Sequence, residues 1–82
     1  MQTYILLNCV PGTEKETITH VKSLDGVVEI NGIWGKYDII VKVSHNTPIG
    51  LDKVVGVLRH IENITSSFTM PVLFGQGGSI DD

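Results

Sequence analysis

The sequence has very few of the side chains that bind metals or perform catalysis. Cys9 is the only cysteine among 82 residues, so the chain forms no internal disulfide and no thiolate metal site. The histidines are His20, His45 and His60, and their spacing matches no metal-binding motif. No Ser/His/Asp or Cys/His arrangement is visible either. We therefore expect a protein that is not an enzyme and that carries no cofactor and no metal.

Positive charge is also scarce, and it is scattered along the chain. Six Lys and Arg against nine Asp and Glu give a formal net charge of −3. A surface that binds duplex DNA needs clustered Lys and Arg, so we expect no direct DNA binding. The N-terminus lacks a basic targeting segment, and no apolar run is long enough to span a membrane. These absences predict a soluble, cytoplasmic protein that does not associate with membranes.

What is present is a globular composition and a regular alternation of strand-like and helix-like segments. Hydrophobic residues make up 41% of the chain and charged residues 18%, which fits one small folded domain. Apolar runs bounded by turn residues predict strands, and apolar residues at helical spacing predict helices. The expected elements are strands at 4–10, 27–34, 39–43 and 64–73, with helices at 14–24 and 48–61. We assign residues 1–74 to the domain and the Gly-rich, acidic residues 75–82 to a flexible tail.

The expected helix ends carry specific signals. Thr13 and Glu16 match a capping box, in which each side chain accepts from the backbone of the other residue. Gly26 supplies a left-handed residue that ends the first helix. Thr47 followed by Pro48 is typical of an N-cap and a first helical turn. Both helices are therefore bounded by residues suited to their ends.

The β-α-β-β-α-β order predicts an α+β fold of the ferredoxin-like kind. Right-handed crossovers place both helices on one face of a four-stranded antiparallel sheet. The strands are nevertheless apolar on both faces, as in residues 4–7 and 39–41. Strands without polar alternation are usually covered on both sides, and this chain has helices for only one. We therefore expect self-association, with a dimer as the smallest assembly.

The middle of the chain predicts a tight hairpin between the second and third strands. Gly35 and Lys36 form its turn, because Gly readily adopts a positive φ, and Trp34, Tyr37 and Asp38 flank them. Asp38 either holds the ammonium group of a ligand or caps backbone amides of its own turn. Turn amides near Gly35 are suited to a carboxylate. The two aromatic side chains are typical of packing or of a subunit contact.

Several segments taken together are similar to a known family. They are Tyr4-Ile5-Leu6-Leu7-Asn8, Pro11-Gly12, Gly26-Val27-Val28, and the run from Gly35-Lys36-Tyr37-Asp38 to Val43. This set resembles the effector-binding domain of the Lrp/AsnC family, the leucine-responsive regulatory proteins, a module also called the RAM domain. The resemblance extends from about Gln2 to Phe74. Family members usually carry an N-terminal helix-turn-helix domain that this chain lacks, so it resembles the stand-alone form.

The resemblance implies a dimer built through the sheets, often stacked into tetramers or octamers, with amino-acid effectors bound between dimers. It also implies that Gly35, Tyr37 and Asp38 line the effector site. Ser67 and Thr69, which share one face of the last strand, match the family's Ser/Thr-rich strand. The predicted ligand-binding residues are therefore Trp34, Gly35, Lys36, Tyr37, Asp38, Ser67 and Thr69. Trp34 stands where many members have Thr, so its indole narrows, reshapes or closes the pocket.

These observations favour a stand-alone amino-acid or small-metabolite sensing and oligomerisation module used in transcription regulation. Two alternatives remain open from the sequence. One is a small dimeric α+β-barrel enzyme of the monooxygenase or isomerase kind, which needs convergent polar groups on the outer sheet face. The other is a partner that co-assembles with full-length Lrp/AsnC-type regulators and has no ligand of its own.

Overall fold

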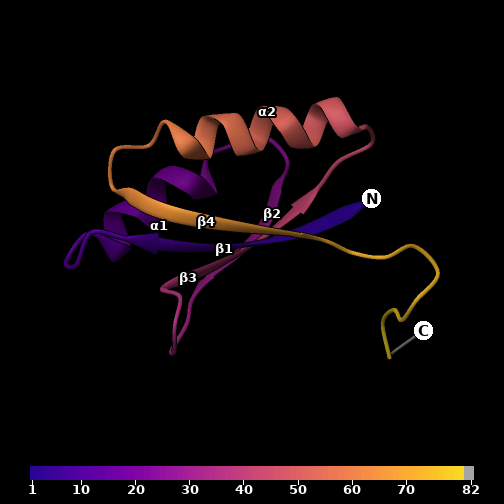
Figure 1. Ribbon diagram of the computed structural model, residues 1–82, viewed down its shortest axis with the longest axis horizontal. Helices are drawn as coiled ribbons and strands as arrows, with labels where there is room; N and C mark the ends of the chain where they lie inside the picture. The colour runs from indigo at the N-terminus through magenta and orange to yellow at the C-terminus, as the bar shows by residue number, and fades with distance from the viewer. Residues whose placement is uncertain (81–82) are drawn as a thin grey trace.

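The structure is a computed structural model that describes residues 1–80. Its elements, in chain order, are β1 (Gln2–Cys9), α1 (Glu14–Lys22), β2 (Val27–Gly32), β3 (Ile39–Ser44), α2 (Pro48–Arg59) and β4 (Ile64–Pro71). The strands form one sheet in the order β2-β3-β1-β4, and every neighbouring pair is antiparallel. The predicted ferredoxin-like α+β fold is therefore confirmed (Figure 1). Asp81 and Asp82, the acidic end of the predicted tail, lie outside the described residues.

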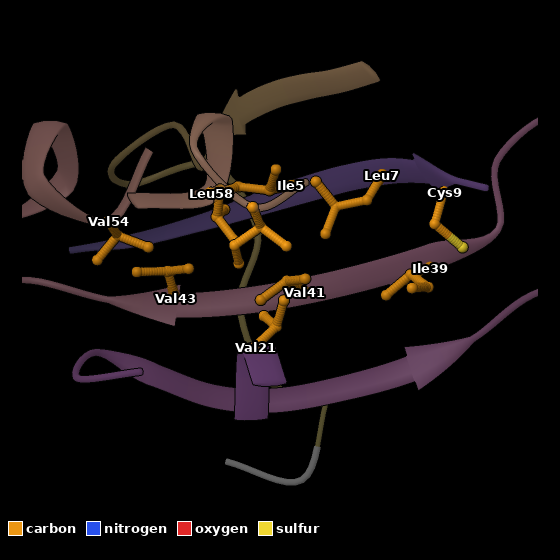
Figure 2. Packing of buried hydrophobic residues seen from close by; sticks show 10 residues of the cluster. Ile5, Leu7, Cys9, Val21, Ile39, Val41, Val43, Val54 and Leu58 are labelled. Atoms are coloured by element: carbon orange, nitrogen blue, oxygen red, sulfur yellow. The ribbon is translucent and has the colours of Figure 1, made fainter. Parts of the chain in front are cut away.

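The core lies between the helices and one face of the sheet. Alternate residues of β1 and β3 are buried, and Val21 of α1 packs in the same cluster as Val54 and Leu58 of α2. Figure 2 shows these side chains converging from both central strands and from the helices. Each fully buried aliphatic side chain stabilises the fold by about 1.5–3 kcal/mol relative to an exposed one. Because the buried residues of β1 and β3 all lie on one side of the sheet, the helices cover that face only.

Two threonines are buried among these apolar residues, which the apolar pattern did not predict. Thr3 is 0% exposed and its hydroxyl lies 2.9 Å from Nε2 of His45, whereas Thr17 is 1% exposed and donates weakly to the Thr13 hydroxyl at 3.5 Å. Both hydroxyls have a hydrogen-bond partner, which offsets the cost of removing them from water. Threonine is thus tolerated at core positions where periodicity points to an aliphatic residue.

The two helix N-termini differ in how well their predicted caps form. At α2 the Thr47 hydroxyl accepts from the Gly50 amide at 3.1 Å, as predicted. At α1 the capping-box prediction is wrong, because Thr13 has φ −103° and ψ 10° and its hydroxyl donates back to the Val10 carbonyl at 2.6 Å. The carboxylate that reaches backward belongs to Glu14, which accepts from the Gly12 amide at 2.6 Å. Helix α1 also ends at Lys22 rather than at residue 24.

The connection between β2 and β3 is wider than the predicted two-residue turn. Strand β2 ends at Gly32, and the Ile33 amide donates to the Asp38 carbonyl at 2.9 Å to close the loop. Gly35 has φ +126°, so the predicted positive φ is confirmed. A tight turn at residues 35–36 would instead pair Trp34 with Tyr37. That pairing is absent because Tyr37 stacks on Phe68 of β4 and the Asp38 carboxylate binds the Cys9 amide of β1. In Figure 1 this loop projects away from α2.

Two glycines provide a matched test of the backbone. Gly26 has φ +92°, and an added Cβ would lie 3.4 Å from the Ser44 carbonyl oxygen and from Cγ2 of Val54. Gly56 lies inside α2 with open space around an added Cβ. We expect Gly26→Ala to lower the free energy of unfolding by about 1–2 kcal/mol. We expect Gly56→Ala to raise it by about 0.5–1 kcal/mol. Urea denaturation at one protein concentration measures both, and the opposite order of stability would contradict the fold.

Candidate functional site: the outer sheet face and the hairpin tip

The sheet face that points away from the helices carries two rows of side chains that cross all four strands, and beside them the polar pairs Gln2–Ser44 and Asn8–Ser66. Residues directly opposite each other on antiparallel strands lie on the same face, so the strand register defines each row. From β4 across β1 and β3 to β2, the rows are Met70, Tyr4, Lys42 and Glu29, then Phe68, Leu6, Ile40 and Asn31. We call these residues the outer face. Neither helix covers it, because both helices pack on the opposite side.

The outer face is apolar over β4 and β1 and polar at the β2 edge. Phe68 is 52% exposed, and the Tyr37 ring from the hairpin loop stacks on it with centroids 6.4 Å apart. Leu6 and Ile40 are half-buried, shielded by their neighbours on the sheet. Contiguous apolar patches on monomers are usually limited to a few hundred Å². The central strands β1 and β3 therefore carry apolar side chains on the outer face, at Leu6 and Ile40, as well as on the face that the helices cover, in agreement with the pattern in residues 4–7 and 39–41.

The hairpin tip is fastened to β1 through Asp38. Its carboxylate Oδ2 accepts from the Cys9 amide at 3.0 Å, and its own amide donates to the Leu7 carbonyl at 2.9 Å. The sequence suggested that Asp38 caps its own turn, but the amide it accepts from belongs to another strand. This arrangement, together with the Tyr37–Phe68 stack, explains why the loop opens. Asp38 is held to β1 and Tyr37 stacks on Phe68 of β4, while the Asp38 carbonyl accepts from the Ile33 amide across the loop.

The seven predicted ligand-binding residues do not converge within one chain. Trp34 and Asp38 line a shallow hollow of about 320 Å³ together with Glu14, Gly32 and Ile33. Trp34 is fully exposed there, at 102%. The Gly35 and Lys36 residues are also exposed at the tip of the loop. A second copy of the chain would have to supply any further wall.

The other three predicted residues lie elsewhere. Tyr37 turns to the outer face, where it meets Phe68. Ser67 lies opposite Leu7 and Thr69 opposite Ile5, so these hydroxyl residues face the helices and not the outer face. They do share one face of β4, as predicted. Phe68 and Met70 are outer-face residues of β4 that the sequence prediction missed, and their alternation with Ser67 and Thr69 is the signal that could have found them.

The His45 ring makes hydrogen bonds through both of its nitrogen atoms. Its Nδ1 lies 3.2 Å from the Thr47 carbonyl oxygen, which can only accept, and its Nε2 lies 2.9 Å from the Thr3 hydroxyl. His60 is exposed and its Nδ1 donates to the Gly56 carbonyl at 2.7 Å. Within residues 1–80 no three His, Cys, Asp or Glu side chains gather to hold a metal ion. Over the same range no helix is long and apolar enough to cross a membrane.

Comparison with known proteins places this architecture among solved structures. No family model matches the chain, and no curated protein matches it. The hypothetical protein PHS023 from Pyrococcus horikoshii is 30% identical, with a TM-score of 0.80 over 88% of this chain and 89% of that one. AsnC of E. coli is 24% identical, with a TM-score of 0.84 over 95% of this chain but only 54% of its own. The regulator NMB0573 from Neisseria meningitidis, solved with L-Met, is 13% identical, with a TM-score of 0.80 over 96% of this chain and 53% of its own.

These similarities show which class of proteins shares the fold and which small protein belongs to the same family. The chain has the fold of about half of an AsnC-type transcriptional regulator, and at these identities that likeness concerns the fold alone. At 30% identity over most of both chains, the chain belongs to the same family as PHS023. Solved structures with this fold thus include transcriptional regulators that are longer than this chain and small proteins that match most of its length.

Replacing Asp38 by Ala removes the acceptor of the Cys9 amide. Cys9 is 6% exposed, so water reaches its amide poorly and the donor is left unsatisfied. We expect Asp38→Ala to lower the free energy of unfolding by about 1–3 kcal/mol, measured by urea denaturation. Asp38→Asn keeps a carbonyl oxygen and serves as the control, with a smaller loss expected. Equal stability of wild type and Asp38→Ala would show that this hydrogen bond contributes nothing.

Proposed function

We propose that the protein is a non-enzymatic, cytoplasmic sensing and oligomerisation module of the Lrp/AsnC regulatory type. It assembles through its outer face and binds an amino acid or a similar small metabolite between subunits. The observation that carries this proposal is the outer face itself. It is a half-polar, half-apolar sheet surface with no helix over it, and burying its apolar part against a second copy is strongly favourable.

The likeness to regulators supports the regulatory role. AsnC and NMB0573 have this fold in about half of their chains, and NMB0573 was solved in complex with L-Met. By analogy, we place the effector of the present chain at the hairpin tip, between subunits. The tip offers backbone amides near Gly35 to a carboxylate and the Asp38 carboxylate, through its second oxygen, to an ammonium group.

A second candidate function is co-assembly with full-length regulators of this type, without a ligand. The observation that favours it is the dispersal of the seven predicted residues within one chain, where only Trp34 and Asp38 line one hollow. A dimeric α+β-barrel enzyme is less well supported, because most of the outer face is aliphatic or aromatic. With a net charge of −3 and no recognition helix, the module would reach DNA only through a partner regulator.

Assembly through the outer face is tested by a matched pair of charge insertions. Phe68, on the outer face, is 52% exposed, and Val57, on α2, is 46% exposed. We expect Phe68→Glu to convert the assembly into monomers at low micromolar concentration, because each copy would have to bury a carboxylate in an apolar interface. Val57→Glu should leave the assembly intact. Size-exclusion chromatography with light scattering measures the mass, and a Phe68→Glu variant with unchanged mass would exclude this interface.

Effector binding at the hairpin tip is tested by calorimetry with a panel of free amino acids. So small a ligand should bind with a Kd of roughly micromolar to millimolar. If the second carboxylate oxygen of Asp38 meets the ligand ammonium, Asp38→Asn should cost about 1.5–3 kcal/mol of binding free energy. The same variant should keep its assembled mass. Binding of equal strength in both proteins would restrict Asp38 to its role at the Cys9 amide, and no binding at all would favour the co-assembly function.

A further inference from the structure

The outer strands of the sheet are β2 and β4, and a hollow lies between β2 and helix α1. It has a volume of about 330 Å³ and is lined by Ile18, Lys22, Val27, Val28, Glu29 and Ile30. A register shift between Val27 and Glu29 interrupts regular pairing near the start of β2, so the regular part of this edge is its second half. An edge strand presents unpaired backbone groups to which a further strand can bond. We call the hollow and the β2 edge together the edge groove.

Two residues of β2 direct their backbone groups to the free edge. On β3 the Ser44 amide donates to the Gly26 carbonyl, which fixes the alternation of bonds between the two strands. In that alternation every second residue of β2 bonds to β3, starting at Glu29. The residues between them, Ile30 and Gly32, therefore hold an amide and a carbonyl each toward the free edge. An added strand can bond to these groups.

Helix α1 supplies a basic wall beside this edge. Lys15, Ile18 and Lys22 recur at spacings of three and four residues, so they lie along one side of the helix. Ile18 faces β2, because a Cβ added to Gly32 would lie 3.8 Å from its Cδ1. The two exposed lysines therefore flank Ile18 on the β2 side of α1. Within residues 1–80 neither lysine forms an ion pair.

The carboxylates near the edge groove are directed elsewhere. Glu14 accepts from the Gly12 amide at 2.6 Å. Glu29 lies opposite Lys42 and therefore points to the outer face, away from the helices. Glu16 follows Lys15 in the sequence and is turned about 100° around the helix from it. The helix side of the edge groove is therefore positively charged, although the chain as a whole is acidic.

We propose that the edge groove binds an extended acidic peptide of a partner protein, which adds to the sheet as a strand beside β2. Opposite residues on neighbouring strands share a face, so every second peptide residue faces α1. Three such residues span about 13 Å, and the helix rises about 10 Å from Lys15 to Lys22, a difference that lysine side chains can bridge. The matching pattern is acidic–x–apolar–x–acidic. The apolar residue lies against Ile18, and each carboxylate pairs with one lysine through charge-assisted hydrogen bonds.

The edge groove does not depend on the outer face. It opens at the edge of the sheet and on its helix side, whereas the proposed function places a second copy on the opposite side. The other edge strand, β4, contains no charged residue between Ile64 and Pro71. The two edges therefore offer different partners, and β4 serves as an internal comparison for peptide binding at β2.

The peptide side of the proposal is tested by fluorescence anisotropy on the full chain. The probe is a labelled peptide of sequence Gly-Glu-Thr-Val-Thr-Glu-Gly, and its control carries Lys in place of both Glu residues. We expect the acidic peptide to bind about tenfold or more tightly than the basic one, because only the acidic one pairs with the two lysines of α1. Equal binding of the two peptides, or no binding of the acidic peptide at millimolar concentration, would overturn the proposal.

The charge pairing is tested on the protein by reversing one lysine. We expect Lys22→Glu to weaken the acidic peptide about tenfold or more and to strengthen the basic peptide. Lys53→Glu reverses an exposed lysine on α2, away from the edge groove, and should change neither affinity by as much. Equal effects of the two variants would show that only the net charge of the protein matters, which overturns a defined site.

The backbone pairing is tested at Gly32. Gly32→Pro removes the amide that faces the free edge, whereas Gly32→Ala keeps it and adds a Cβ at an ordinary contact distance. We expect the acidic peptide to bind Gly32→Ala as it binds wild type, and Gly32→Pro about tenfold or more weakly. Urea denaturation verifies that both variants are folded. Equal binding by two folded variants would contradict strand addition.

Amide hydrogen exchange measured by NMR locates the bound peptide. We expect the Ile30 and Gly32 amides to exchange more slowly in the complex. Slower exchange confined to β4 would place the peptide at the other edge and overturn the proposal. An assembled mass that falls in Gly32→Pro, without peptide binding to wild type, would mean that a second copy covers β2, which also overturns it. Assembly through the outer face is measured separately with Phe68→Glu, so the two proposals can fail independently.

Discussion

The constraint on which this structure depends is that the central strands β1 and β3 carry apolar side chains on both faces of the sheet, whereas the described helices cover only one face. Along β1 the inward side chains Ile5 and Leu7 are completely buried against the helices, while Leu6 between them points to the uncovered side. Burying apolar surface is favourable on either face of the sheet. The gain is the same whether the covering surface belongs to the same chain or to another one. The uncovered apolar part of the outer face is the observation on which the proposed self-association rests.

The hairpin tip and the outer face are physically connected, which gives the proposed sensor a route for coupling. Asp38 fixes the loop to the Cys9 amide of β1, and Tyr37 stacks on Phe68 of β4. A ligand that repositions the loop would therefore disturb the apolar surface that a second copy covers. Coupling of this kind requires that the ligand interact differently with the two assembly states. Because Asp38 and Tyr37 are adjacent in the loop, a ligand at the tip would act on the outer face through only two residues.

Much of the fold was predictable from the sequence, because it follows from patterns within single elements. The Thr47 cap and the positive φ of Gly26 are local properties. The order of the elements also indicated correctly that both helices lie on one face of the sheet. The Lrp/AsnC resemblance pointed to the same fold, which AsnC shares over about half of its chain.

What the sequence did not provide depends on contacts between elements. The capping box failed because Thr13 turns back to the Val10 carbonyl, a choice set by the Pro11-Gly12 turn. The loop was expected to be tight because nothing in residues 33–38 reveals that Asp38 binds a β1 amide. Ser67 and Thr69 were placed with the hairpin tip, whereas strand register turns them toward the helices. The role of those residues in ligand binding stays a prediction.

The central claim is that a second copy of the chain covers the outer face. The most direct test is the mass of the unmodified protein by sedimentation equilibrium at low micromolar concentration and physiological salt. The account predicts at least twice the chain mass of 9.0 kDa, in an even multiple if dimers stack further. A single species at 9.0 kDa would contradict it, because the apolar rows of the sheet would then be stable in water without a cover.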